Sequence, residues 1–168
     1  MHIPLSCKTY AEEEIAEVLD SLRSGAVTMG DKCLAFESAF AKYVEARHAI
    51  FLNSGSSANL LAWFALTNPI WSEPFNPGFE VIVPAISWST TIWPIVQAGG
   101  TPVLVDCNPE TLCIETSAVE AAISPKTVAV CPVHPLGNVC DMDRLMRICE
   151  EHKIILVEDT CESLGSRY

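Results

Sequence analysis

A short Gly/Ser turn carries residue types that can bind an anion. Gly55, Ser56 and Ser57 follow an apolar run and open a predicted helix over 57–66. Backbone N–H groups at a helix N-terminus and the helix dipole both favour negative charge, and the two hydroxyls add further donors. The Gly-Lys-Ser/Thr signature of a P-loop is absent. Two interpretations remain open: a phosphate site, or an ordinary strand–helix turn with a serine cap.

An aromatic residue follows the next predicted strand. Trp88 lies shortly after the apolar run 80–84. Ligands of open α/β sheets bind beyond the carboxyl ends of the strands. The indole is therefore placed to stack on a planar ring. The alternative is that this large apolar side chain packs in the hydrophobic core.

A carboxylate ends the last apolar run of the chain. Asp159 follows residues 154–157, and an ionised Asp in a low-dielectric site needs a cationic partner, such as a protonated pyridine nitrogen. The alternative is a helix N-cap. If a helical turn starts here, Glu162 lies beside Asp159. His134 also follows a predicted strand, but it has no Ser or Cys partner at a diagnostic spacing, so we expect a structural or pocket-lining role.

Five short apolar runs must position these side chains. They are rich in Val and Ile and show little alternation, as strands buried on both faces do. The runs are 48–52, 80–84, 102–106, 128–133 and 154–158, and the predicted helices between them are 57–66, 90–98, 116–123 and 141–152. This alternation predicts a three-layer α/β/α fold with a mostly parallel sheet. We expect Gly55, Trp88 and Asp159 to converge on one edge of it.

Capping signals predict where several helices begin. Thr9 and Glu12 have the spacing of a capping box for a helix near 10–23. Asp31 can cap a second helix. Acidic residues at 141 and 143 most simply start the helix over 141–152, where they suit the dipole.

The composition argues against several classes of protein. Of the 168 residues, 49% are hydrophobic and 18% are charged, which excludes a disordered tail. The net charge of −11 argues against a nonspecific nucleic-acid or anionic-membrane binder. Two uncharged stretches, 49–72 and 81–105, are long enough to span a membrane. Prolines, glycines and polar clusters divide them, so we expect buried elements of a soluble domain instead.

The cysteines and the first residues bear on the cellular compartment. None of the eight cysteines forms a C-x-x-C pair, so neither a zinc ribbon nor a thioredoxin-type site is expected. We also expect no metal site. The first residues lack the basic region and apolar core of a signal peptide. We expect a cytoplasmic protein with reduced thiols.

Taken together, these segments resemble the DegT/StrS-type sugar aminotransferase family, a branch of the fold-type-I pyridoxal 5'-phosphate (PLP) enzymes. The similar segments share the order and spacing of its N-terminal half. They are 3–6, 28–30, 53–58, 81–84, 98–103, 105–106, 132–134 and 158–165. Only nine residues follow Asp159. We therefore expect residues 1–168 to be the N-terminal part of the PLP-binding large domain, with a C-terminal domain absent.

The resemblance implies a role for each candidate residue. In the family, the cofactor phosphate is held at the turn matching Gly55 and Ser56, beside Ser57. The aromatic matching Trp88 stacks on the pyridine ring. The acid matching Asp159 pairs with the pyridinium nitrogen. The position matching Glu162 contacts the ring hydroxyl and is usually Gln or His in the aminotransferases.

The resemblance also implies a reaction. It implies transamination of a nucleotide-linked keto-deoxy sugar, in cell-surface polysaccharide or secondary-metabolite biosynthesis. It further implies an amino donor such as glutamate, and a homodimer with the active site at the subunit interface. Glu162 and the run 53–61 are closer to the related sugar 3-dehydratases, which are the alternative. A non-catalytic, PLP-binding regulatory member is a third possibility.

The residue that decides between these reactions has no match in the chain. Aminotransferases of the family bind the cofactor covalently through a Lys, which the 3-dehydratases replace with His. The five lysines present match no such motif. We therefore expect no catalytic residue within the 168 residues, and no activity from this chain alone.

Overall fold

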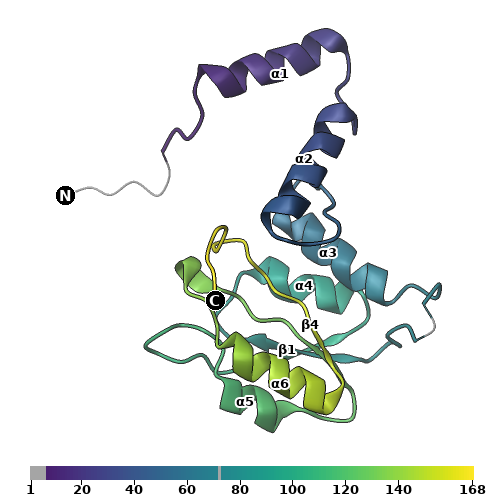
Figure 1. The fold of residues 1–168 in the computed structure, drawn as a ribbon. Helices are drawn as coiled ribbons and strands as arrows, with labels where there is room; N and C mark the ends of the chain where they lie inside the picture. Colours follow the sequence, from purple (N-terminus) through teal and green to yellow (C-terminus); the bar gives the residue numbers. More distant parts are fainter. Residues whose placement is uncertain (1–6, 72) are drawn as a thin grey trace. The chain divides into compact units, whose positions relative to one another are not determined.

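The computed structural model describes residues 7–71 and 73–168. The chain divides into two compact units, Met1–Phe51 and Leu52–Tyr168. The described part of the first unit holds two helices, α1 (Glu12–Ser24) and α2 (Asp31–Tyr43). The second holds a four-stranded sheet with helices on both faces, and all the candidate site residues belong to it (Figure 1).

The first unit begins its helices at other residues than predicted. The residue that precedes α1 is Ala11, and its backbone N–H donates to the Glu14 carboxylate at 2.7 Å. The capping box predicted at Thr9 is therefore wrong. Gly30 precedes α2 without a side-chain cap, so Asp31 is the first helical residue. Its charge suits the positive end of the helix dipole, but it does not cap.

The predicted strand over 48–52 is also wrong, because these residues adopt no strand conformation. A strand needs a neighbouring backbone to complete its ladder of hydrogen bonds. The four described strands pair only with one another. The Phe51 N–H instead donates to the Glu37 carboxylate at 2.8 Å.

The other four predicted strands are confirmed and are parallel. They are β1 (Glu80–Pro84), β2 (Thr101–Val105), β3 (Thr127–Val130) and β4 (Ile155–Leu156), in the spatial order β2-β1-β3-β4. The strand β4 is shorter than expected. Backbone pairing nevertheless continues beyond it, because the Asp159 N–H donates to the Pro132 carbonyl at 2.9 Å. This pairing fixes Asp159 at the carboxyl edge of the sheet.

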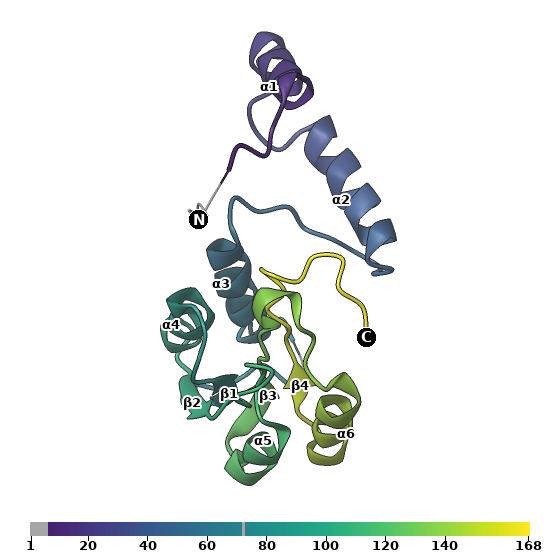
Figure 2. The ribbon, with the colours of Figure 1, turned by 90° about the vertical axis from the view of Figure 1, so that its left-hand side faces the viewer.

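Helices cover both faces of this sheet, as Figure 2 shows. One face carries α3 (Gly55–Leu66) and α4 (Ser89–Gln97), and the other carries α5 (Thr116–Ala122) and α6 (Met142–His152). Successive side chains of β1 point to opposite faces. Val81 and Val83 therefore pack with Trp63 on one side, and Ile82 packs with Leu145 on the other. This is the predicted three-layer α/β/α arrangement.

The long uncharged stretches are divided in the way the sequence predicts. Much of 81–105 forms β1, α4 and β2, and α3 lies within 49–72. Across residues 7–71 and 73–168, none of the helices has both the length and the apolar character needed to cross a membrane.

Gly100 gives a stability prediction. A Cβ added there would lie 2.4 Å from the ring of Phe79, which is buried in the core. We expect Gly100→Ala to lower the free energy of unfolding by about 1–3 kcal/mol, because the ring cannot move without disturbing the core. Urea denaturation measures the loss. Gly55→Ala is the matched control, since no atom lies within 4 Å of its added Cβ. Equal stability of the two variants would mean that the added Cβ at position 100 does not clash with the Phe79 ring.

Candidate functional site

The N-terminus of α3 is open and partly uncapped. Ser54 precedes the helix, and its hydroxyl accepts a hydrogen bond from the Ser57 N–H at 3.2 Å. The predicted serine cap is therefore present, at Ser54. The ladder of helical hydrogen bonds begins with Ala58, so the amides of Gly55 and Ser56 precede it. Free space lies beside Gly55, which leaves room for an anion.

Trp88 lies just before α4, at the carboxyl edge of the sheet, where Asp159 also lies. It is the N-cap residue of α4, and 76% of its surface is exposed. The interpretation that Trp88 packs in the core is therefore wrong. The residue follows the buried strand β1 and lies outside the core that this strand forms. Stacking of its indole on a planar ring stays a prediction.

Asp159 joins three elements. Its Oδ2 accepts hydrogen bonds from the Asn59 Nδ2 at 3.0 Å and from the Thr91 hydroxyl at 2.8 Å. Asn59 lies in α3 and Thr91 in the first turn of α4. The residues from 159 onward form turns and no helix, so the N-cap interpretation of Asp159 is wrong. The carboxylate instead fastens the end of the sheet to two helix N-terminal regions.

Asn59 and Thr91 are site residues that were not predicted from the sequence. For Thr91, the available signal was a polar side chain shortly after the predicted strand over 80–84. For Asn59, it was an amide within the largely apolar predicted helix over 57–66. The Asn59 amide group has a definite orientation. Its Nδ2 donates to both the Thr90 carbonyl, at 3.2 Å, and Asp159. Because both partners are acceptors, the nitrogen and not the oxygen must face them.

Glu162 lies in a turn and not in a helical segment after Asp159. Its carboxylate accepts a hydrogen bond from the Leu136 N–H at 2.7 Å. Leu136 has a φ of 53°, a left-handed conformation that is costly for a residue with a Cβ. Glu162 thus stabilises the loop after β3 from the segment after β4.

His134 has the structural role that we expected. It is buried, and its Nδ1 accepts a hydrogen bond from the Cys140 N–H at 3.2 Å. The proton therefore lies on Nε2, which is 2.9 Å from the Glu158 carboxylate and donates to it. The ring ties the loop after β3 to the end of β4.

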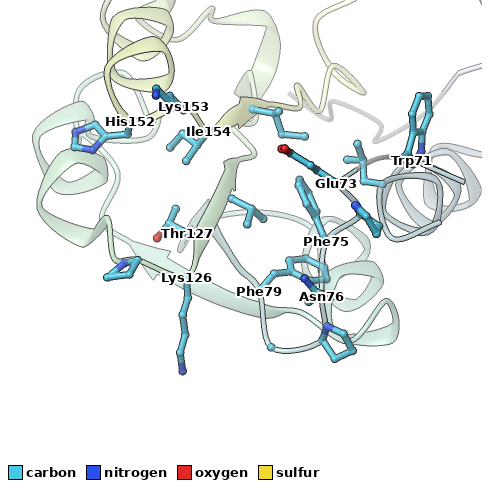
Figure 3. Close-up of a pocket in the computed structure, with 17 residues that line it drawn as sticks. Trp71, Glu73, Phe75, Asn76, Phe79, Lys126, Thr127, His152, Lys153 and Ile154 are labelled. Atoms are coloured by element: carbon cyan, nitrogen blue, oxygen red, sulfur yellow. The ribbon is translucent and has the colours of Figure 1, made fainter. Parts of the chain in front are cut away.

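Two of the cavities on the described part of the second unit lie at different places on it. One of about 340 Å³ lies between α3 and α4, and Ser56, Ser57 and Thr90 contribute to its walls. A larger cavity of about 810 Å³ lies at the amino ends of β1, β3 and β4, with Phe75 and Lys126 among its lining residues (Figure 3). Asp159 is at the opposite, carboxyl edge of the sheet. Of the candidate site residues, Ser56 and Ser57 line the smaller cavity, and none lines the larger one.

The cysteines are all free, and their burial predicts their reactivity. Burial raises the pKa of the Cys131 thiol, and the charge of Asp159 adds to this effect. Burial also raises the pKa of Cys140, to about 12. Cys7 and Cys161 are exposed. A raised pKa leaves little reactive thiolate near neutral pH.

We therefore expect iodoacetamide to alkylate Cys7 and Cys161 first in the folded protein. Alkylation of Cys140 should accelerate only as the pH rises toward its pKa or as the protein unfolds. Peptide mapping by mass spectrometry measures the order of modification. Alkylation of Cys131 as fast as that of Cys161 would contradict the burial.

Comparison with known proteins decides the family. The model of the DegT/DnrJ/EryC1/StrS aminotransferase family matches residues 8–168. The chain belongs to this family. It is 39% identical over 168 residues to the GDP-4-keto-6-deoxy-D-mannose 3-dehydratase of Yersinia pseudotuberculosis, a match that covers 99% of the chain and 42% of that protein.

Solved structures of the DegT/DnrJ/EryC1/StrS family share the fold. The E. coli GDP-4-keto-6-deoxy-D-mannose-3-dehydratase with bound hydrated PLP has a TM-score of 0.92 and 36% identity, over 99% of this chain and 43% of that one. An aminotransferase from Psychrobacter cryohalolentis has a TM-score of 0.86 and 28% identity, over 98% and 41%. The predicted fold class is thus confirmed. The chain spans about two fifths of the length of each of these proteins.

Proposed function

We propose that this chain is the N-terminal part, residues 1–168, of the PLP-binding large domain of a sugar-modifying enzyme. We propose that the enzyme acts on a nucleotide-linked keto-deoxy sugar and that its reaction is 3-dehydration. The observation that carries the proposal is the Asp159 carboxylate, held where α3, α4 and the end of β4 meet. Because the chain belongs to the DegT/DnrJ/EryC1/StrS family, this carboxylate is a candidate ligand of the cofactor.

The residues at this edge fit PLP in three respects. The amides of Gly55 and Ser56 and the hydroxyls of Ser56 and Ser57 lie at an open helix N-terminus, which suits a phosphate. The exposed indole of Trp88 offers a flat face for the ring. Asp159 offers an anion to a protonated ring nitrogen. When bound, PLP supplies an electron sink, and a protonated ring nitrogen strengthens it.

Each residue then has a defined task. Ser56 and Ser57 anchor the phosphate and so fix one end of the cofactor. Trp88 restricts the plane of the ring. Asp159 keeps a proton on the ring nitrogen, because separating that proton from its counter-ion costs electrostatic free energy.

Glu162 favours dehydration. Aminotransferases of the resembled family usually carry Gln or His at this position, and the 3-dehydratases resemble this chain more closely there. The 39% identity to a 3-dehydratase supports the same reaction. Transamination is the second candidate, supported by the likeness to the Psychrobacter aminotransferase. Glutamate as amino donor, a homodimer and a cytoplasmic location are further parts of the proposal that rest on the family resemblance.

Product analysis tests the reaction. The full-length protein is incubated with PLP, a GDP-linked 4-keto-6-deoxy sugar, and glutamate carrying an isotopically labelled amino group. We expect a sugar product that lacks the C3 hydroxyl and carries no labelled nitrogen. Labelled nitrogen in the sugar would establish transamination instead. PLP binding without either product would indicate a non-catalytic member, and would overturn the proposed activity.

A further inference from the structure

The two oxygens of the Asp159 carboxylate have unequal hydrogen-bond partners. Oδ2 accepts two hydrogen bonds from side chains, at 2.8 and 3.0 Å. Oδ1 accepts one, from the Cys161 N–H, at 3.3 Å. Each oxygen of an ionised carboxylate can accept about two hydrogen bonds. Oδ2 is therefore saturated, and Oδ1 keeps capacity for a further donor.

The two donors to Oδ2 are fixed in place. Thr91 is buried, with 1% of its surface exposed, and it lies in the first turn of α4. The other hydrogen of the Asn59 amide is bound by the Thr90 carbonyl at 3.2 Å. Both donors thus belong to helices that pack together, and rotation of the carboxylate would break two hydrogen bonds at once.

We propose that Asn59 and Thr91 are positioning residues, which hold Oδ2 so that Oδ1 faces the ring nitrogen of PLP. This inference rests on the proposed function, since it assigns Asp159 to that nitrogen. Neither residue contacts the cofactor. Each acts through the orientation of Asp159, because its hydrogen bond to Oδ2 holds the carboxylate in place.

Removal of the hydroxyl at position 91 tests the proposal in the full-length protein. Thr91→Val keeps the shape and loses the donor, whereas Thr91→Ser keeps the donor. We expect Thr91→Val to lower kcat by about 10- to 100-fold, as loss of a group that orients a ligand of the site typically does. KM for the sugar should stay within about twofold, because the hydroxyl does not contact it. Thr91→Ser should restore most of kcat.

The protonation state of the PLP ring nitrogen distinguishes a residue that positions Asp159 from one that only stabilises the fold. Nitrogen NMR of isotopically labelled PLP reports whether that nitrogen is protonated. We expect a protonated nitrogen in the wild-type protein, and a shift toward the deprotonated signal in Thr91→Val and in Asn59→Leu. Thr127→Val is the matched control. Thr127 is also buried, at 7% exposure, and its hydroxyl accepts from the Ser124 N–H at the amino end of the sheet.

The outcomes distinguish failure of the positioning role from failure of the proposed function. A wild-type signal and kcat in Thr91→Val, with a stability loss like that of Thr127→Val, would overturn the positioning role and leave the proposed function intact. Failure of the wild-type protein to bind PLP would overturn both. A shifted nitrogen signal in Thr127→Val as large as that in Thr91→Val would also overturn the positioning role.

Discussion

In the full-length enzyme, Asp159→Asn is expected to lower kcat by about 10²–10³-fold. Charged groups that stabilise charge on the cofactor or substrate often make the largest contribution to catalysis. The amide has the shape of the carboxylate but no charge. Its oxygen can still accept from Asn59 and Thr91, the donors to Oδ2. Its NH₂ group would then take the place of Oδ1, so a donor would face a protonated ring nitrogen. Steady-state kinetics measures the loss.

Asp143→Asn is the control for the change of charge. Asp143 is an exposed residue in the first turn of α6, away from the site. This variant should keep wild-type kcat. Wild-type kcat in Asp159→Asn would mean that Asp159 only fastens α3 and α4 to the end of the sheet, and that its role beside the pyridinium nitrogen is wrong.

The largest expected loss of stability follows truncation of Trp63. This residue of α3 is fully buried and packs on the sheet in the cluster that contains Val81, Val83 and Ile95. We expect Trp63→Ala to lower the free energy of unfolding by about 3–5 kcal/mol, because it leaves a cavity under the helix. Urea denaturation measures the change.

A second tryptophan serves as control for this truncation. Trp93 in α4 is 60% exposed, and Trp93→Ala should cost less than about 1 kcal/mol. If the two variants were equally stable, the packing of α3 on the sheet would be contradicted. Trp63→Ala should also weaken PLP binding, since the same helix carries Ser56 and Asn59.

Much of the fold could be predicted because buried parallel strands have a distinctive composition. The runs that became β1 to β4 are short, rich in Val and Ile, and separated by helices. The run 48–52 is also apolar after His48, although it has one Ile and no Val, and it forms no strand. Composition indicates that a segment can be buried, but pairing depends on a neighbouring strand that local sequence does not specify. The caps predicted at Thr9 and Asp31 were wrong because Ala11 and Gly30, which have no capping side chain, precede α1 and α2.

The site could be predicted only in part. The turn at Gly55 and the carboxylate at Asp159 stood out because their residue types carry chemistry at predicted strand ends. The partners of Asp159 did not, because Thr91 lies 68 residues away and Asn59 lies 100 residues away along the chain. Contacts of that range depend on how α3 and α4 pack on the sheet. For Trp88, the choice between core and surface likewise required the fold.

A crystal structure of the full-length protein with PLP tests the central claim most directly. We expect the phosphate at the amides of Gly55 and Ser56, the ring beside Trp88, and the ring nitrogen within hydrogen-bond distance of Oδ1 of Asp159. PLP bound at another place, or at this edge of the sheet without contact to Asp159, would contradict the account.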